Sequence, residues 1–165
     1  MTVAVCPGSF DPVTLGHVDI VTRASRLFDK VIVAVITNPN KTPFFSVEER
    51  KVLLTKSLVG LSNIEIVSFD GLLVDLAQEK GANVIVKGLR AVSDYEYEFQ
   101  MALANHKLNS NIETVFLTTN SENMFLSSSA VKQIARFGGE LAGFVPDCVC
   151  EDIKKRLYRG GNENK

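Results

Sequence analysis

Short runs of apolar, β-branched residues alternate along most of this chain with longer amphipathic segments, and this alternation restricts the possible folds more than any other feature. The predicted strands are Val3–Cys6, Val31–Thr37, Ile64–Phe69, Val84–Lys87 and Thr114–Thr118. These runs are almost continuously apolar, as parallel strands covered on both faces are. The order of elements predicts an α/β fold, with one doubly wound, Rossmann-like domain built around a five-stranded parallel sheet.

Local signals mark the ends of several helices between these strands. Ser46–Glu49 and Ser93–Glu96 both fit a capping box, in which a serine and a glutamate satisfy free amides at a helix start. Lys80-Gly81 predicts a helix end, because a cation and then a glycine commonly follow the last turn. Pro146 suits the first turn of a final helix.

Composition excludes several classes of protein. With 165 residues, of which 45% are hydrophobic and 22% charged, the chain resembles one globular domain. We expect this domain to span residues 1–159 and a flexible tail to follow at 160–165. No apolar run approaches the roughly 20 residues of a membrane span, and no signal peptide is evident, so we expect a cytoplasmic protein with no membrane partner. The net charge of −1 disfavours nucleic acid as a partner.

The three cysteines and two histidines lack the spacing of a metal site, so the sequence predicts no protein-bound metal. An odd number of cysteines also disfavours a disulfide framework. Cys148 and Cys150 form a C-x-C pair, which leaves a redox role open as an alternative.

The loop after the first predicted strand carries the clearest functional pattern. Ligands of doubly wound sheets bind beyond the carboxyl ends of the strands, and this loop lies at such an end. Gly8 and Gly16 allow sharp turns and a close approach of the backbone to a ligand. The loop is neither G-x-G-x-x-G nor a Walker A sequence, which disfavours a dehydrogenase or a P-loop enzyme. His17 stands where a helix begins, so its imidazole can face a phosphate together with the free amides of the helix start.

These residues carry a resemblance to a known family. Thr14-Leu15-Gly16-His17 matches the T/H-x-G-H signature of nucleotidylyltransferases, and the run from Pro7 to His17 closely resembles the start of bacterial phosphopantetheine adenylyltransferases. The resemblance extends over about residues 3 to 158. It implies ATP and 4′-phosphopantetheine as substrates, Mg²⁺ with the ATP, coenzyme A as a feedback inhibitor and a homo-oligomer, by resemblance a hexamer.

The resemblance also implies roles for individual residues. His17, Lys41 and Arg90 would be catalytic, with His17 stabilising the α-phosphoryl transition state. The acceptor would be bound by Ser9, Lys41, Leu73 and Lys87. The predicted ATP contacts are Ser9, Phe10, His17, Gly88, Leu89, Arg90, Glu98, Asn123, Met124, Phe125, Leu126, Ser127, Ser128 and Ser129.

Three residues in two segments depart from the family pattern. Relatives commonly have arginine where this chain has Lys87, and lysine keeps the charge but loses the bidentate fork. Asn123-Met124 stands where relatives often have an aromatic residue and a serine, which affects the expected adenine contacts.

The same residues have simpler interpretations when the resemblance is set aside. Lys41 would be a solvated loop charge, Leu73 part of the core and Glu98 part of a solvated helix face. The hydroxyls of residues 127–129 would cap a helix. Lys87 and Arg90 flank Gly88, and two such cations resist burial unless an anion is present.

No protein nucleophile paired with a base is evident, which favours direct in-line attack of an acceptor phosphate on the α-phosphorus of ATP. Two alternatives remain open. One is another small nucleotidylyltransferase, acting on nicotinate mononucleotide or on an alcohol phosphate such as glycerol 3-phosphate. The other is a non-catalytic nucleotide sensor with the same fold.

Overall fold

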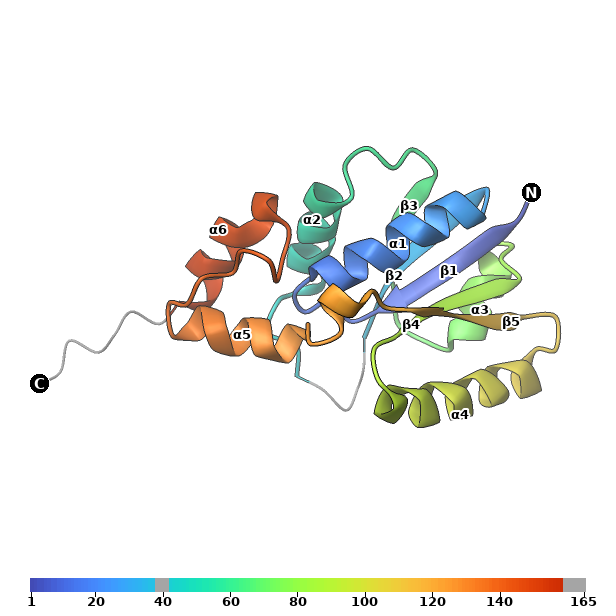
Figure 1. Cartoon of the computed structure of the whole chain (residues 1–165). Helices are drawn as coiled ribbons and strands as arrows, with labels where there is room; N and C mark the ends of the chain where they lie inside the picture. Colours follow the sequence, from blue (N-terminus) through green and yellow to red (C-terminus); the bar gives the residue numbers. More distant parts are fainter. Residues whose placement is uncertain (38–41, 159–165) are drawn as a thin grey trace, which may run out of the picture.

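The computed structural model describes residues 1–37 and 42–158. Within these residues the strands are β1 (Val3–Gly8), β2 (Lys30–Ile36), β3 (Ile64–Phe69), β4 (Val84–Leu89) and β5 (Glu113–Thr118). The helices are α1 (Leu15–Leu27), α2 (Val47–Ser57), α3 (Leu73–Glu79), α4 (Val92–Leu108), α5 (Ser128–Arg136) and α6 (Asp147–Leu157), with a short 3₁₀ helix, η1, at Ser121–Asn123. The predicted α/β fold is confirmed. The five described strands form one parallel sheet in the order β3-β2-β1-β4-β5 (Figure 1).

Helices cover the two faces of the sheet, as a doubly wound fold requires. On one face Ala4, Cys6 and Val33 pack against α1, α2, α5 and α6. On the other face Val5 and Ile32 pack mainly against α3. Alternate residues of β1 therefore enter different core layers, and both layers are apolar because the strand is covered on both sides.

The strand order reverses between β1 and β4, and these two strands pair over a much shorter length than their neighbours do. β1 pairs with β2 over six residues, from Val3 to Gly8. It pairs with β4 only at Ala4–Val84 and Val5–Ile85. The carboxyl halves of β1 and β4 therefore separate and leave a crevice between them, which is the usual ligand site of such sheets.

Two of the four helix signals in the sequence are confirmed in full. Ser46 and Glu49 form the predicted capping box, with the Ser46 amide 2.7 Å from Glu49 Oε2. At the end of α3 the Gly81 amide donates to Gln78 and the Ala82 amide to Ala77, a Schellman arrangement. Gly81 has a φ of +65°, which glycine adopts without strain.

Some predicted boundaries and caps are wrong. β1 and β4 continue two residues further than predicted, through Gly8 and Leu89, because their outer neighbours β2 and β5 keep pairing with them. The helix start predicted at Ser93 is wrong. α4 already begins at Val92, because the Asp94 amide donates to the Ala91 carbonyl at 3.1 Å.

The final helix begins at Asp147, with Pro146 just before it as the N-cap, one residue outside the predicted first turn. The predicted tail at 160–165 lies outside the described residues. No helix in the described ranges is both long enough and apolar enough to cross a membrane.

Candidate active site

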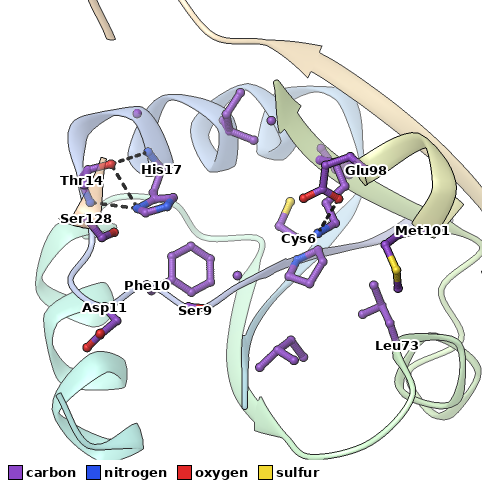
Figure 2. A pocket seen from close by; sticks show the side chains of 18 of the residues that line it. Cys6, Ser9, Phe10, Asp11, Thr14, His17, Leu73, Glu98, Met101 and Ser128 are labelled. Carbon is purple, nitrogen blue, oxygen red and sulfur yellow. Dashed lines mark hydrogen bonds and ion pairs between the residues drawn. The ribbon is translucent and has the colours of Figure 1, made fainter. Parts of the chain in front are cut away.

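A cavity of about 1010 Å³ lies at the carboxyl ends of β1 and β4. Its walls come from the β1–α1 loop, the end of β4, one face of α4 and the start of α5. Figure 2 shows two different ends: His17, Thr14, Phe10 and Ser128 gather at one, and Leu73 and Met101 approach each other at the other. We call the end around His17 the polar end and the end lined by Leu73 and Met101 the apolar end, with the Glu98 carboxylate beside Met101 (Figure 2).

The Thr14-x-Gly16-His17 motif is itself the cap of α1. The His17 amide donates to Thr14 Oγ1 at 3.3 Å, and the Thr14 amide donates to His17 Nδ1 at 3.0 Å (Figure 2). This is a capping box in which histidine replaces the usual glutamate. Because Nδ1 accepts a hydrogen bond, the proton of the neutral ring is on Nε2, which is free to donate to a ligand.

The His17 ring is neutral at physiological pH. Burial, together with the nearby positive charge of Arg90, lowers the pKa of His17 from 6.5 to about 4. A neutral His17 ring held in this way presents its Nε2–H in a fixed direction, without carrying a full charge into the cavity.

The Phe10 side chain packs against the His17 ring. Its ring meets the His17 ring edge-on, with centroids 5.1 Å apart, and its side chain is buried. Phe10 has a φ of +48°, in the left-handed region that a phenylalanine rarely adopts. A Cβ on Gly8 would lie 2.8 Å from the Phe10 ring, so only glycine leaves room for this ring under the loop.

Two predicted cations, Lys87 in the carboxyl-terminal half of β4 and Arg90 just after the strand, are each paired with a carboxylate from α4. Lys87 Nζ lies 3.1 Å from Glu98 Oε2, and Arg90 Nε donates to Asp94 Oδ2 at 3.2 Å. The Glu98 oxygen is buried and accepts no hydrogen bond from any described group, so the contact with Lys87 is an ion pair only. Protein carboxylates thus supply the anions that the sequence led us to expect from a ligand.

Arg90 also ties the end of β4 to the segment before α5. Its Nη1 donates to the Leu126 carbonyl at 2.7 Å, and Leu126 is buried. Gly88 lets α1 pack closely on β4, since a Cβ there would lie 2.9 Å from Cγ1 of Ile20. These contacts hold the end of β4 against α1 and against the segment before α5.

The serines at the start of α5 have different positions. Ser127 caps the helix and accepts from the Ala130 amide at 3.1 Å, as the sequence predicts. Ser128 donates to the Pro12 carbonyl at 2.8 Å, and Ser129 is exposed at the cavity wall. The simple role as a cap accounts for Ser127 and leaves the Ser129 hydroxyl available to a ligand.

Most of the predicted site residues line the same cavity. They are Ser9, Phe10, His17, Leu73, Lys87, Gly88, Arg90, Glu98, Leu126, Ser127, Ser128 and Ser129. Leu89, Asn123, Met124 and Phe125 are not among the lining residues, although Asn123 lies beside Gly16. Their predicted ATP contacts stay predictions. Lys41 lies outside the described residues.

Several lining residues were not found from the sequence. On α4, Tyr97, Met101, Ala104 and Leu108 are spaced by four, three and four positions, and this stripe faces the cavity. The spacing is visible in the sequence, but it is also typical of a stripe that packs on the core. Arg50 is buried among core leucines of α2, and no sequence signal indicates that it reaches the cavity.

Two further observations limit the possible chemistry: the state of the Cys6 thiol and the arrangement of potential metal ligands. Burial raises the pKa of the Cys6 thiol to about 12, although Lys87 partly opposes this, so Cys6 remains protonated and is no nucleophile. In the part of the chain that the structure describes, no three His, Cys, Asp or Glu side chains are grouped as a metal site would need.

The parallel α/β sheet and the T-x-G-H loop at its switch point define a Rossmann-like protein with a ligand cavity beside the start of α1, and comparisons with known proteins identify its family. The cytidylyltransferase-like family model matches residues 5–134. A solved structure from Vibrio parahaemolyticus, provisionally assigned as a nicotinate-nucleotide adenylyltransferase, has a TM-score of 0.69 at 18% identity and covers 98% of both chains. A lipopolysaccharide core biosynthesis protein from Thermoplasma volcanium has a TM-score of 0.55 at 21% identity, covering 73% of this chain and 99% of its own. At these identities both structures show the fold alone.

Curated relatives are much more similar in sequence. A phosphopantetheine adenylyltransferase from Clostridium tetani is 54% identical over 94% of this chain and 98% of its own length. One from Caldanaerobacter subterraneus is 56% identical over 96% of this chain and 99% of its own. The chain belongs to the cytidylyltransferase-like family and, within it, to the phosphopantetheine adenylyltransferases.

Proposed function

We propose that this protein transfers the adenylyl group of ATP to 4′-phosphopantetheine, giving dephospho-coenzyme A and pyrophosphate in coenzyme A biosynthesis. The observation that carries the proposal is the similarity, at 54–56% identity over nearly the whole chain, to relatives that bear the name phosphopantetheine adenylyltransferase. As a member of this family the protein is an enzyme of the nucleotidyltransferase class.

The polar end of the cavity suits the reacting phosphates. His17 offers an Nε2 donor with a fixed direction, and the start of α5 offers hydroxyls and free amides. Arg90 brings positive charge close to His17, and Lys87, paired with Glu98, brings a second positive charge to the part of the cavity beside Met101 (Figure 2). We assign the ATP polyphosphate to Arg90 and residues 127–129, and the acceptor phosphate to Ser9 and Lys87.

The apolar end suits the pantetheine arm, which is mostly aliphatic with two amide groups. Leu73, Met101 and Leu108 provide apolar contact, while Asn105 provides polar atoms. A groove of this kind would bind the arm and hold its phosphate near His17.

The chemistry needs no protein nucleophile. A phosphate oxygen of the acceptor attacks the α-phosphorus of ATP, a new P–O bond forms, and the bond from the α-phosphorus to the bridging oxygen breaks, so that pyrophosphate leaves. His17 Nε2 donates to the α-phosphoryl oxygens as charge moves onto them, while the cations hold both substrates in line.

Mg²⁺ enters as part of the substrate MgATP. Among the described residues, the carboxylates lining the cavity are Asp11 and Glu98, and each is already within ion-pair distance of a lysine. This arrangement fits an ion held mainly by the phosphates and water, since Mg²⁺ needs few protein ligands.

Three further properties belong to the proposal through the family resemblance: a cytoplasmic location, inhibition by coenzyme A and a homo-oligomer, expected to be a hexamer. The exposed side chains of Tyr95, Phe99 and Leu103, which do not line the cavity, support the oligomer, because an apolar helix surface of this kind is suited to burial between subunits. Sedimentation velocity would test it, and a monomer at all concentrations would contradict it.

The direct test is an assay with ATP, Mg²⁺ and 4′-phosphopantetheine that follows pyrophosphate and dephospho-coenzyme A together. We expect equal amounts of both products. Nicotinate mononucleotide and glycerol 3-phosphate serve as control acceptors and should give little pyrophosphate. Preference for a control acceptor would favour another nucleotidylyltransferase, and ATP binding without turnover on any acceptor would favour the nucleotide sensor.

A further inference from the structure

The loop between β1 and α1 is tied to two other parts of the cavity wall through one buried carboxylate. Asp11 is only 5% exposed. It accepts from the Phe44 amide at 3.0 Å and the Phe45 amide at 2.8 Å, just before α2. It also accepts from Lys132 Nζ of α5 at 2.9 Å.

The Asp11 side chain is charged. Burial raises the pKa of this carboxyl, but the hydrogen bonds from the Phe44 amide, Lys132 and the Phe45 amide outweigh burial and lower it overall. A buried carboxylate is stable only where such donors surround it. Asp11 and Lys132 therefore neutralise each other within the wall, and the Lys132 charge is not free to bind a phosphate.

The three segments that Asp11 joins surround the polar end of the cavity. Thr42 and Pro43, just before the two donating amides, line the cavity, and so does Lys132. Phe10, next to Asp11 in the chain, supports the His17 ring. One side chain thus fixes the distance between the His17 loop, the 42–45 segment and α5.

From this arrangement we propose that Asp11, held by Lys132, is a positioning residue for the transfer reaction: it keeps the wall at residues 42–45 and the start of α5 at a fixed distance from His17. The inference rests on the proposed function. Asp11 touches neither substrate in this account, and its effect passes through the backbone of the loop and of residues 44 and 45.

The test is steady-state kinetics with MgATP and 4′-phosphopantetheine for Asp11→Asn, Lys132→Met and the double variant. Asparagine keeps the size of the side chain but removes the charge and one acceptor oxygen. We expect kcat to fall about 10- to 100-fold in Asp11→Asn, because a misplacement of about 1 Å can reduce the rate about 100-fold. The KM of each substrate should stay within about threefold, since the binding groups themselves remain.

The double variant tests the coupling. If Asp11 and Lys132 act as one unit, the double variant is no slower than Asp11→Asn alone, whereas independent residues would give multiplied losses. Lys132→Arg keeps the charge and the donors, and it should restore most of the activity that Lys132→Met loses.

Two controls distinguish a positioning role of Asp11 from a purely structural one. The first is a matched ion pair far from the cavity, and the second is a count of the ATP-binding sites that remain folded. Lys56 and Asp152 form another pair between two helices, α2 and α6, at 2.6 Å and away from the cavity. Asp152→Asn should leave kcat unchanged. Titration of Asp11→Asn with a non-hydrolysable ATP analogue gives the fraction of protein with a folded binding site. We expect kcat to remain below the wild-type value after it is divided by this fraction.

Two outcomes would overturn the inference: wild-type kcat per site in Asp11→Asn, or multiplied losses in the double variant. If Asp11→Asn does not fold, Lys132→Met and Lys132→Arg decide, because Lys132 lies nearer the surface; equal kcat in wild type and Lys132→Met would then refute the coupling. Absence of transfer by the wild-type protein would overturn the proposed function, and the inference with it.

Discussion

The two walls of the cavity are built in different ways. In the wall formed by the β1–α1 loop, the polar groups that hold the loop are bonded within the chain: Thr14 to His17, Asp11 to two amides and Lys132, and the Ser9 carbonyl to Arg50 at 2.9 Å. In the other wall, formed by the end of β4 and by α4 and called the α4 wall here, Lys87 of β4 is paired with Glu98 of α4, and apolar side chains such as Tyr97 are exposed.

The difference indicates two tasks. Groups that stabilise a transition state gain most when they are fixed before the substrate arrives, because no reorganisation is then needed during the reaction. Groups that bind a charged substrate must be able to exchange partners, and the Lys87–Glu98 ion pair, which lacks hydrogen-bond geometry, can do so. The loop wall therefore suits catalysis, and the α4 wall suits recognition of the acceptor.

The largest effect is expected from the loop wall. His17→Ala should lower kcat by about 100- to 1,000-fold or more, because it removes a preorganised donor to the transferred group. Pyrophosphate release measures the change, and circular dichroism checks the fold. His106→Ala is the matched control, since His106 lies on the exposed part of α4 and outside the cavity lining. Near-normal turnover in folded His17→Ala would contradict the role assigned to His17.

A smaller effect, of a different kind, is expected from the α4 wall. Lys87→Met should raise the KM for 4′-phosphopantetheine about 10- to 100-fold, because a hydrogen bond to a charged group contributes about 1.5–3 kcal/mol. The KM for ATP should change much less. Lys87→Arg keeps the charge and should restore most of the affinity. A loss confined to kcat would show that the two walls do not divide binding and catalysis in this way.

The pH dependence tests whether the loop wall keeps His17 neutral. With a pKa of about 4 in the folded protein and 6.5 ordinarily, His17 should not titrate between pH 8 and pH 5.5. Between about pH 6.5 and pH 4 the unfolded chain binds a proton at His17 that the folded chain does not. The contribution of His17 to the free energy of unfolding is therefore complete above about pH 6.5 and is lost as the pH falls towards 4. NMR titration can show this, as the chain has only two histidines and His106→Gln assigns them. A midpoint for His17 near pH 6.5 would contradict it.

The smallest effect is expected far from both walls. Cys148 and Cys150 lie at the start of α6, and neither lines the cavity. Replacing both by serine should change kcat and KM less than twofold, and reducing agents should have no effect. Loss of transfer in a folded double variant would instead support the redox alternative.

Much of the fold was predictable from the sequence, because the strands are apolar runs and the helices begin and end at local signals. The same holds for His17, since the T-x-G-H motif is a local capping box whose partners are three residues apart. Short-range interactions of this kind depend on neighbouring residues and are therefore visible in a single sequence.

Only the tertiary structure decided how distant residues meet. Asp11 and Lys132 are 121 positions apart and Arg50 and Ser9 are 41 apart, so no local pattern indicates that they join. The stripe on α4 illustrates the same limit: its spacing predicts a helix with one apolar face, but whether that face meets the core or a cavity depends on where β1 and β4 separate. Local sequence thus determined the elements and the motif at His17, whereas long-range packing determined the walls around them, because packing depends on contacts that the order of residues does not encode locally.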